Sequence, residues 1–318
     1  MIAKSNKKIV VIGGGTGVFT VLSGLKKYFN NLTAIVTTAD DGGSTGILRE
    51  EFGILPPGDI RRALIALSSS DKKMLSQLFG YRFDEGSGLL GHSFGNLMIT
   101  ALERITGSFE KAILEAGRLL GVQGRVIPVT LKKISLVAKL EDGRLVRGES
   151  NIDIPKHDGR LKIKKVWLEP AAAINPAAKR AVLEADAIML GPGDLYTSLV
   201  PNLLVKGMKP ALRRARGKKI YFVNLMTKFG ETTGFRASDF VNAMEKYLGR
   251  GVLDYAVVNK TKPAMMRFRP YAEEKAEFVE VDLENFQKPT PIAANLIRKY
   301  GFIRHDPEKL AKLIQMLV

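Results

Sequence analysis

Residues 9–46 constrain the fold more than any other part of this chain. An apolar, β-branched run at 9–12 is followed at once by three glycines, and a segment with apolar residues at helical spacing comes next. A second apolar run, at 32–36, leads into the acidic, glycine-rich loop 40–46. Runs without polar positions suit strands buried on both faces of a parallel sheet. The order of strand, glycine loop, helix, strand and acidic loop is half of a nucleotide-binding βαβ unit.

The glycine loop at 13–17 has the composition of a phosphate-binding turn. Without a Cβ, glycine lets backbone N–H groups approach a phosphate, and the helix N-terminus that follows adds a favourable field for an anion. A tight strand-to-helix turn without a ligand is the alternative. Val18 stands where the dinucleotide fingerprint needs its third glycine, and no G-x-x-x-x-G-K-[ST] motif occurs. Ligand contacts are predicted for Gly13, Gly14, Gly15, Thr16 and Gly17.

Asp40 and Asp41 form an acidic pair directly after the second predicted strand. One acidic residue at this place in a dinucleotide fold holds a ribose, whereas a pair among glycines and hydroxyls fits a catalytic or substrate loop better. Paired carboxylates also suit magnesium and metal-assisted phosphoryl transfer. We therefore treat both residues as candidate catalytic residues and candidate magnesium ligands. Holding ribose hydroxyls, or capping a helix, is the open alternative.

Composition limits the class of protein. The chain has 318 residues, enough for one large α/β domain or two small ones, and it has no cysteine for disulfides, metal thiolates or nucleophiles. Its three histidines are widely spaced, which argues against a histidine zinc site. No apolar run has membrane-spanning length, and residues 1–8 lack the apolar core of a signal peptide. We therefore expect a cytoplasmic protein without a membrane span.

The chain is strongly basic, with 49 Lys and Arg against 32 Asp and Glu and a net charge of +17. The densest basic run, 206–219, contains no acidic and no aromatic residue. No DNA- or RNA-binding motif accompanies it, and a solvated helix face is the simpler explanation. We therefore expect an anionic small molecule as the partner, and no nucleic acid.

The strand–loop–helix texture recurs along the chain. Glycine- and hydroxyl-rich loops at 191–198 and 224–233 each follow an apolar run. The carboxyl ends of parallel strands share one edge of a sheet, so these loops and the first two are predicted to line a single crevice. The pattern predicts a doubly wound, Rossmann-like α/β fold with a mainly parallel sheet in three layers, built as one domain over 1–318.

Four local features complete this prediction. Alternating residues and D-G turns predict a β-rich insertion at about 128–168, and a further strand is expected at 277–281. Asp59 is expected to cap a helix over 60–67. His92, in a glycine-rich segment, is a candidate general acid or base, or a cation for a phosphate, and a structural role is its alternative.

Several runs resemble the 2-phospho-L-lactate transferase-like (CofD-like) family. They include G-G-G-T-G at 13–17, T-A-D-D-G-G-S-T-G at 38–46, P-P-G-D-I-R-R-A-L at 56–64 and A-D-A-I-M-L-G-P-G-D-L-Y-T-S at 185–198. Within the family they are most similar to the YvcK-type gluconeogenesis-factor branch. The enzymatic branch moves a lactyl-phosphate group from a guanosine diphosphate donor to a deazaflavin alcohol with magnesium. The gluconeogenesis-factor branch instead binds UDP-sugars such as UDP-N-acetylglucosamine, and supports cell shape and growth on gluconeogenic carbon sources.

The resemblance implies roles for individual positions. It places Asp40 and Asp41 on the acceptor and metal side, and the loop 13–17 at the phosphates. Asp194 departs from the serine usual in the branch, and a carboxylate beside a diphosphate would repel it. Lys228-Phe229 departs as well, because the pattern more often has Gln followed by Pro or Leu. Further nucleotide or sugar contacts are predicted for His92, Asn96, Gly191, Gly193, Thr197, Asn224, Thr227, Tyr271 and Arg304.

Together these features predict a UDP-sugar-binding regulatory protein for which binding requires no cofactor, with magnesium as an optional ion. The alternative is a phospholactyl or phosphoryl transferase that uses magnesium and a nucleoside-diphosphate-activated donor. The sequence leaves open whether a reaction is catalysed. It also leaves open a homodimer and the identity of a protein partner in cell-wall or carbon metabolism.

Overall fold

The computed structural model describes residues 3–318, and its main element is a seven-stranded sheet with the order β10-β9-β8-β7-β1-β2-β3. Every pair of neighbouring strands in this sheet is parallel. The strands are β1 (Ser5–Gly13), β2 (Phe29–Val36), β3 (Arg125–Pro128), β7 (Ala187–Leu190), β8 (Lys218–Phe222), β9 (Tyr255–Asn259) and β10 (Thr290–Ala294). The chain builds β1 to β3 in one direction and then returns to add β7 to β10 on the other side of β1, so the order reverses between β1 and β7.

The central strand β1 divides the hydrophobic core into two layers. Ile9 and Val11 pack into one cluster of buried side chains, while Val10 and Ile12 pack into the other. All four are at most 2% exposed. This double burial is why the run contains no polar residue, as expected for the centre of a parallel sheet.

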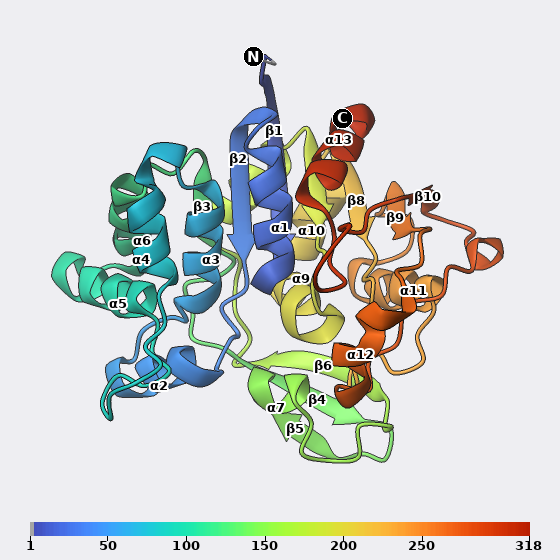
Figure 1. Ribbon diagram of the computed structural model, residues 1–318, viewed down its shortest axis with the longest axis horizontal. Helices are drawn as coiled ribbons and strands as arrows, with labels where there is room; N and C mark the ends of the chain where they lie inside the picture. The colour runs from blue at the N-terminus through green and yellow to red at the C-terminus, as the bar shows by residue number, and fades with distance from the viewer. Residues whose placement is uncertain (1–2) are drawn as a thin grey trace.

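Helices cover both faces of the sheet (Figure 1). On the first face lie α1 (Gly15–Leu25), α3 (Gly58–Leu67), α4 (Lys73–Gly80), α5 (Phe94–Thr106), α6 (Phe109–Leu119) and α13 (Pro307–Leu317). On the second face lie α8 (Pro176–Glu184), α9 (Val200–Leu204), α10 (Met208–Arg214) and α11 (Ala237–Leu248). The short helices α2 (Gly43–Phe52) and α12 (Arg269–Glu273) follow loops outside these layers. The predicted three-layer, doubly wound α/β fold is confirmed.

A small antiparallel sheet is inserted between β3 and α8. It has the order β5-β4-β6 and consists of β4 (Ser135–Leu140), β5 (Leu145–Arg147) and β6 (Ile163–Glu169). The one-turn helix α7 (Glu149–Asp153) connects β5 to β6. Buried residues of β4 and β6 join the core of the second face. The predicted β-rich insertion is therefore present, below the carboxyl edge of the main sheet in Figure 1.

Two local expectations were wrong. Residues 277–281 form no strand, and Phe278 makes only an isolated bridge to Met226. Asp59 does not cap α3, because Pro57 holds the N-cap position and Asp59 lies in the first turn with its carboxylate directed to the glycine loop. Within residues 3–318, none of the helices combines the length and apolar character that crossing a membrane requires.

Candidate functional site

The loops that follow β1, β2, β7 and β8 meet at the carboxyl edge of the sheet and line one cleft with two lobes. The wide lobe has a volume of about 920 Å³ and the narrow lobe about 520 Å³. Both lobes are lined by Thr16, Gly17, Asp153, Ile154, Gly193 and Asp194, so they adjoin at this boundary. The cleft lies at the point where the strand order reverses, which is where open α/β sheets bind ligands.

Gly17 brings the two sides of this switch point together. A Cβ on Gly17 would lie 1.8 Å from the Pro192 carbonyl oxygen, so only glycine allows α1 to approach the loop after β7 this closely. Gly15 begins α1 with φ of +64°, a left-handed conformation that also favours glycine. The predicted Gly13 and Gly191 line neither lobe. Some of these glycines therefore determine how closely the loops pack, in addition to those that line the cleft.

The Asp59 carboxylate occupies part of the glycine loop. Its Oδ1 accepts a hydrogen bond from the Gly15 N–H at 2.9 Å and lies 3.8 Å from Arg62 Nη1. Burial, followed by the nearby charge of Asp40, raises the pKa of Asp59 to about 6. A Cβ at Gly15 would have Arg62 Nη1 and Ser198 Oγ each 3.7 Å away. The loop thus lies beside a guanidinium and a hydroxyl that suit a phosphate.

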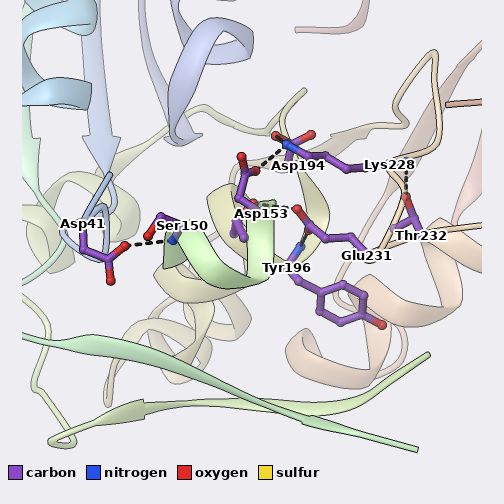
Figure 2. A network of polar contacts seen from close by, with 9 residues as sticks. Asp41, Ser150, Asp153, Asp194, Tyr196, Lys228, Glu231 and Thr232 are labelled. Carbon is purple, nitrogen blue, oxygen red and sulfur yellow. Dashed lines mark hydrogen bonds and ion pairs between the residues drawn. The ribbon is translucent and has the colours of Figure 1, made fainter. Parts of the chain in front are cut away.

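Asp40 and Asp41 point in different directions. Asp40 lines the narrow lobe, accepts a hydrogen bond from the Gly42 N–H at 3.0 Å, and has its pKa raised by burial. Asp41 lines neither lobe. Its two carboxylate oxygens accept from the backbone N–H groups of Glu149 at 3.1 Å and Ser150 at 2.8 Å, at the start of α7. Figure 2 shows the contact with Ser150. This geometry matches helix capping for Asp41 and leaves Asp40 facing the cleft.

Glu149, which follows this cap, also lines the narrow lobe. Burial raises the pKa of its carboxyl to about 9, and the like charges of Asp40, Asp153 and Asp41 add to the shift. The group is therefore protonated at neutral pH. The narrow lobe thus combines the carboxyl groups of Asp40, Asp59 and Glu149 with the arginines 61, 62 and 82.

The predicted pair His92 and Asn96 lies at the wall of the narrow lobe. His92 is buried, with its Nδ1 3.2 Å from Ser44 Oγ, and lines neither lobe. Asn96 lines the narrow lobe, and its Oδ1 accepts from Arg61 Nε at 2.9 Å. Burial lowers the pKa of Arg61 to about 10, so this arginine stays charged. Asn96 therefore orients a buried cation, and the geometry of His92 fits its structural alternative.

A network of acids around Lys228 lies at the boundary of the two lobes (Figure 2). The Lys228 ammonium donates to Asp153 at the end of α7 and to Asp194 Oδ2 at 3.3 Å. Glu231 lies behind, fully buried, and accepts from the Tyr196 N–H and from the Thr197 hydroxyl, each at 2.9 Å. Burial, and then the charge of Asp194, raises the pKa of Glu231 to about 8. The predicted Thr197 thus contacts a buried acid.

Sequence reasoning did not single out Asp153, Glu231 or Glu149 as parts of the site. The available signals were weak: Glu231 belongs to the polar loop 224–233, and Asp153 lies in the insertion, which carried no predicted site residue. Oxygen atoms of Asp153, Asp194 and Glu231 lie within 4.8 Å of one another, a spacing that would suit a metal ion. The Lys228 ammonium already bonds two of these three carboxylates.

The wide lobe contains the remaining predicted contacts, Asn224, Thr227, Tyr271 and Arg304. The Tyr271 hydroxyl donates to the Ile303 carbonyl at 3.2 Å, and its ring packs edge-on against Phe302 at 6.5 Å between centroids. The Arg304 guanidinium lies over the same Phe302 ring, 5.6 Å from its centroid. An aromatic ring and a cation therefore stand together at one end of the cleft.

The fold and the cleft define a Rossmann-like α/β protein with a polar, phosphate-compatible site at its topological switch point. The family model described as 2-phospho-L-lactate transferase CofD matches residues 9–297, and the chain belongs to this family. A relative from Nostoc sp. (strain PCC 7120) is 47% identical over 313 residues, which cover 96% of this chain and 68% of the relative. The Bacillus subtilis (strain 168) gluconeogenesis factor is 42% identical, with 96% of each chain covered.

A solved structure supports the same placement. The crystal structure of an upf0052 family protein from Bacillus halodurans superimposes with a TM-score of 0.93 at 40% identity, covering 98% of this chain and all of that one. The resemblance to the gluconeogenesis-factor branch is therefore confirmed, as is the fold class. These comparisons identify the group of proteins, and what the cleft binds is a separate question.

Proposed function

We propose that this protein is a regulator that binds a UDP-sugar, with UDP-N-acetylglucosamine as the leading candidate, in the two-lobed cleft. The observation that carries the proposal is the division of the cleft. Tyr271 and Arg304 line the wide lobe, whereas the glycine loop and Arg62 line the boundary and the narrow lobe. A nucleotide sugar needs an aromatic or apolar contact for its base and cations or N–H donors for its diphosphate. The wide lobe, at about 920 Å³, is large enough for a ligand of this size.

The biological part of the proposal follows the branch to which the chain belongs. Ligand occupancy is proposed to report nucleotide-sugar supply to cell-shape control and to growth on gluconeogenic carbon sources, in the cytoplasm. A chromosomal deletion complemented by wild type or by a binding-deficient variant tests this part. Equal growth and equal cell shape with both alleles would contradict a signalling role for the ligand.

A second candidate is a magnesium-assisted phospholactyl or phosphoryl transferase. The narrow lobe favours it, because Asp40 and Asp59 face a space that is also lined by Arg61 and Arg62. Carboxylate oxygens suit magnesium, and the ion would neutralise charge on a transferred phosphoryl group. Asp41 does not fit as a ligand, since its two oxygens already accept backbone N–H groups. Product formation from a guanosine diphosphate donor and a deazaflavin alcohol would favour this candidate.

Thermal-shift and calorimetric titrations distinguish the two functions. We expect UDP-N-acetylglucosamine to raise the Tm more than GDP does, since ligand binding to the native state stabilises it in proportion to occupancy. Tyr271→Ala is expected to weaken UDP-N-acetylglucosamine binding at least tenfold without lowering the Tm of the free protein by more than a few degrees. Tyr300→Ala is the matched control, because this tyrosine is 74% exposed and lines neither lobe. Equal affinity in wild type and Tyr271→Ala would remove that residue from the site.

A further inference from the structure

Lys228 lies beside the boundary between the two lobes, which a ligand that spans both lobes must cross. Its two acidic partners, Asp153 and Asp194, line both lobes, and Lys228 itself lines the wide one. Thr16 and Gly17, in the first turn of α1, line the same boundary. The N-terminus of a helix favours an anion, so a diphosphate is best placed between this turn and the Lys228 side chain.

The Lys228 ammonium is both held in place and incompletely used. It has three N–H donors, and two bond to Asp153 and Asp194. The side chain is 30% exposed, so the third donor has access to the cleft. Burial opposes the charge of Lys228, but Asp194, Glu231 and Asp153 outweigh this effect and hold its pKa above the ordinary lysine value. Lys228 is therefore a fixed cation with one donor left for a ligand.

The ion pair also changes what Asp194 does in the cleft. Alone, the Asp194 carboxylate would repel a diphosphate, but at 3.3 Å the Lys228 ammonium offsets its charge. The two residues thus form one unit, contributed by the loop after β7 and the loop after β8.

We propose that Lys228 is the cation that contacts the diphosphate of a nucleoside-diphosphate ligand in this cleft, and that it makes binding independent of a divalent metal. The inference rests on the proposed function. The three carboxylates around Lys228 have the spacing of a metal site, and the ammonium supplies the positive charge that a metal ion would otherwise provide. Removing the ammonium should therefore expose a metal-binding cluster.

Calorimetric titration of UDP-N-acetylglucosamine, in magnesium and in EDTA, tests the proposal. Wild type should bind with the same Kd, within twofold, in both buffers. Lys228→Gln should bind at least tenfold more weakly in EDTA and regain affinity when magnesium or manganese is added. Asp194→Ser/Lys228→Gln removes the uncompensated carboxylate with the ammonium, so in EDTA it should bind more tightly than Lys228→Gln but still more weakly than wild type, because the contact to the diphosphate is lost. Lys156→Gln, at an exposed lysine of the β-rich insertion that lines neither lobe, should behave as wild type.

Each outcome decides the question. Lys228→Gln that binds like wild type in EDTA, or wild type that loses binding in EDTA, overturns the proposal. If Lys228→Gln does not fold, the double variant, which lacks the ammonium but keeps the charge balance, carries the comparison, and binding equal to wild type in EDTA then overturns the proposal. Wild type that fails to bind UDP-N-acetylglucosamine overturns the proposed function instead, and titration with GDP then decides the role of Lys228. Failure of both ligands in wild type overturns both proposals.

Discussion

The contact between Asp41 and α7 allows a quantitative prediction. The first N–H groups of a helix have no partner within the helix, and Asp41, more than one hundred residues earlier in the chain, accepts two of them. Asp41→Ala removes both acceptors from a partly buried helix end. Loss of an N-cap costs about 0.5–2 kcal/mol, and hydrogen bonds to a charged group are worth about 1.5–3 kcal/mol, so we expect the free energy of unfolding to fall by about 2 kcal/mol.

This cost converts into a measurable change in Tm. The entropy of unfolding near 60 °C is about 2.1 cal/mol/K per residue. For a chain of 318 residues, the Tm therefore falls by about 1.5 °C for each kcal/mol lost from the free energy of unfolding. Asp41→Ala should then lower the Tm by about 3 °C. Asp41→Asn keeps one acceptor oxygen and should lower it by roughly half as much. Differential scanning calorimetry resolves both shifts.

Hydrogen exchange shows whether the loss is local to α7. Backbone N–H groups of 149–153 should exchange faster in Asp41→Ala, because the helix is held at this end by Asp41. Asp142→Ala is the control in the same insertion, since its carboxylate bonds only Arg144 in an exposed hairpin turn. It should leave exchange at 149–153 unchanged. Wild-type Tm and wild-type exchange in Asp41→Ala would refute the cap, and weaker ligand binding by Asp41→Asn at an unchanged Tm would return Asp41 to the ligand site.

Limited proteolysis should yield one stable core across 3–318 with early cuts confined to loops, and two separately stable halves would contradict the single-domain organisation. Gly17→Ala should abolish soluble folded protein or lower the Tm by more than 10 °C, because its Cβ would overlap the Pro192 carbonyl; a Tm near wild type would show that the switch point can relax. The folded-state pKa of Glu149, about 9, lies above its ordinary 4.5, so its contribution to stability is complete below about pH 4.5 and is lost as pH rises towards 9. Glu149→Gln should therefore lose less stability than wild type between pH 5 and 9 in urea unfolding, and parallel profiles would contradict the shift.

The parallel sheet could be predicted from the sequence because strands that are buried on both faces consist of apolar residues. Residues 9–12 and 32–36 are apolar throughout, as strands covered on both faces must be. Strand β10 escaped prediction, since its edge position leaves it half-buried and its sequence T-P-I-A-A lacks a long apolar run. The expected strand at 277–281 has the right alternation but finds only a single bridge partner. Strand pairing of this kind depends on tertiary neighbours that local patterns do not contain.

The site could be predicted only as far as each loop carries its own signal. The glycine loop and the acidic loop were recognised because their residue types are unusual within a few positions. The Asp153–Lys228 contact joins residues 75 positions apart, and the Asp41 cap joins positions more than one hundred apart. Taken alone, each of these charged residues has the local sequence of an ordinary surface residue. Asp194 and Lys228 each depart from the pattern of the branch that the sequence resembles, but only the fold shows that their opposite charges form an ion pair.

The contact of Asp59 with the glycine loop implies that an anion in this cleft would need donors from several loops and not from one. In a dinucleotide fingerprint the first helix N-terminus offers its free N–H groups to a pyrophosphate. Here the Gly15 N–H already bonds a buried carboxylate, so part of that capacity is used within the protein. A diphosphate would then need donors from elsewhere, and those that line the cleft include Arg62 from α3, Ser198 from the loop after β7 and, in our proposal, Lys228 from the loop after β8. Each of these donors comes from a different segment, so affinity for an anion would depend on how closely the loops are held together. The close packing at Gly17 and the contacts that α7 makes with Asp41 and Lys228 hold these loops in place.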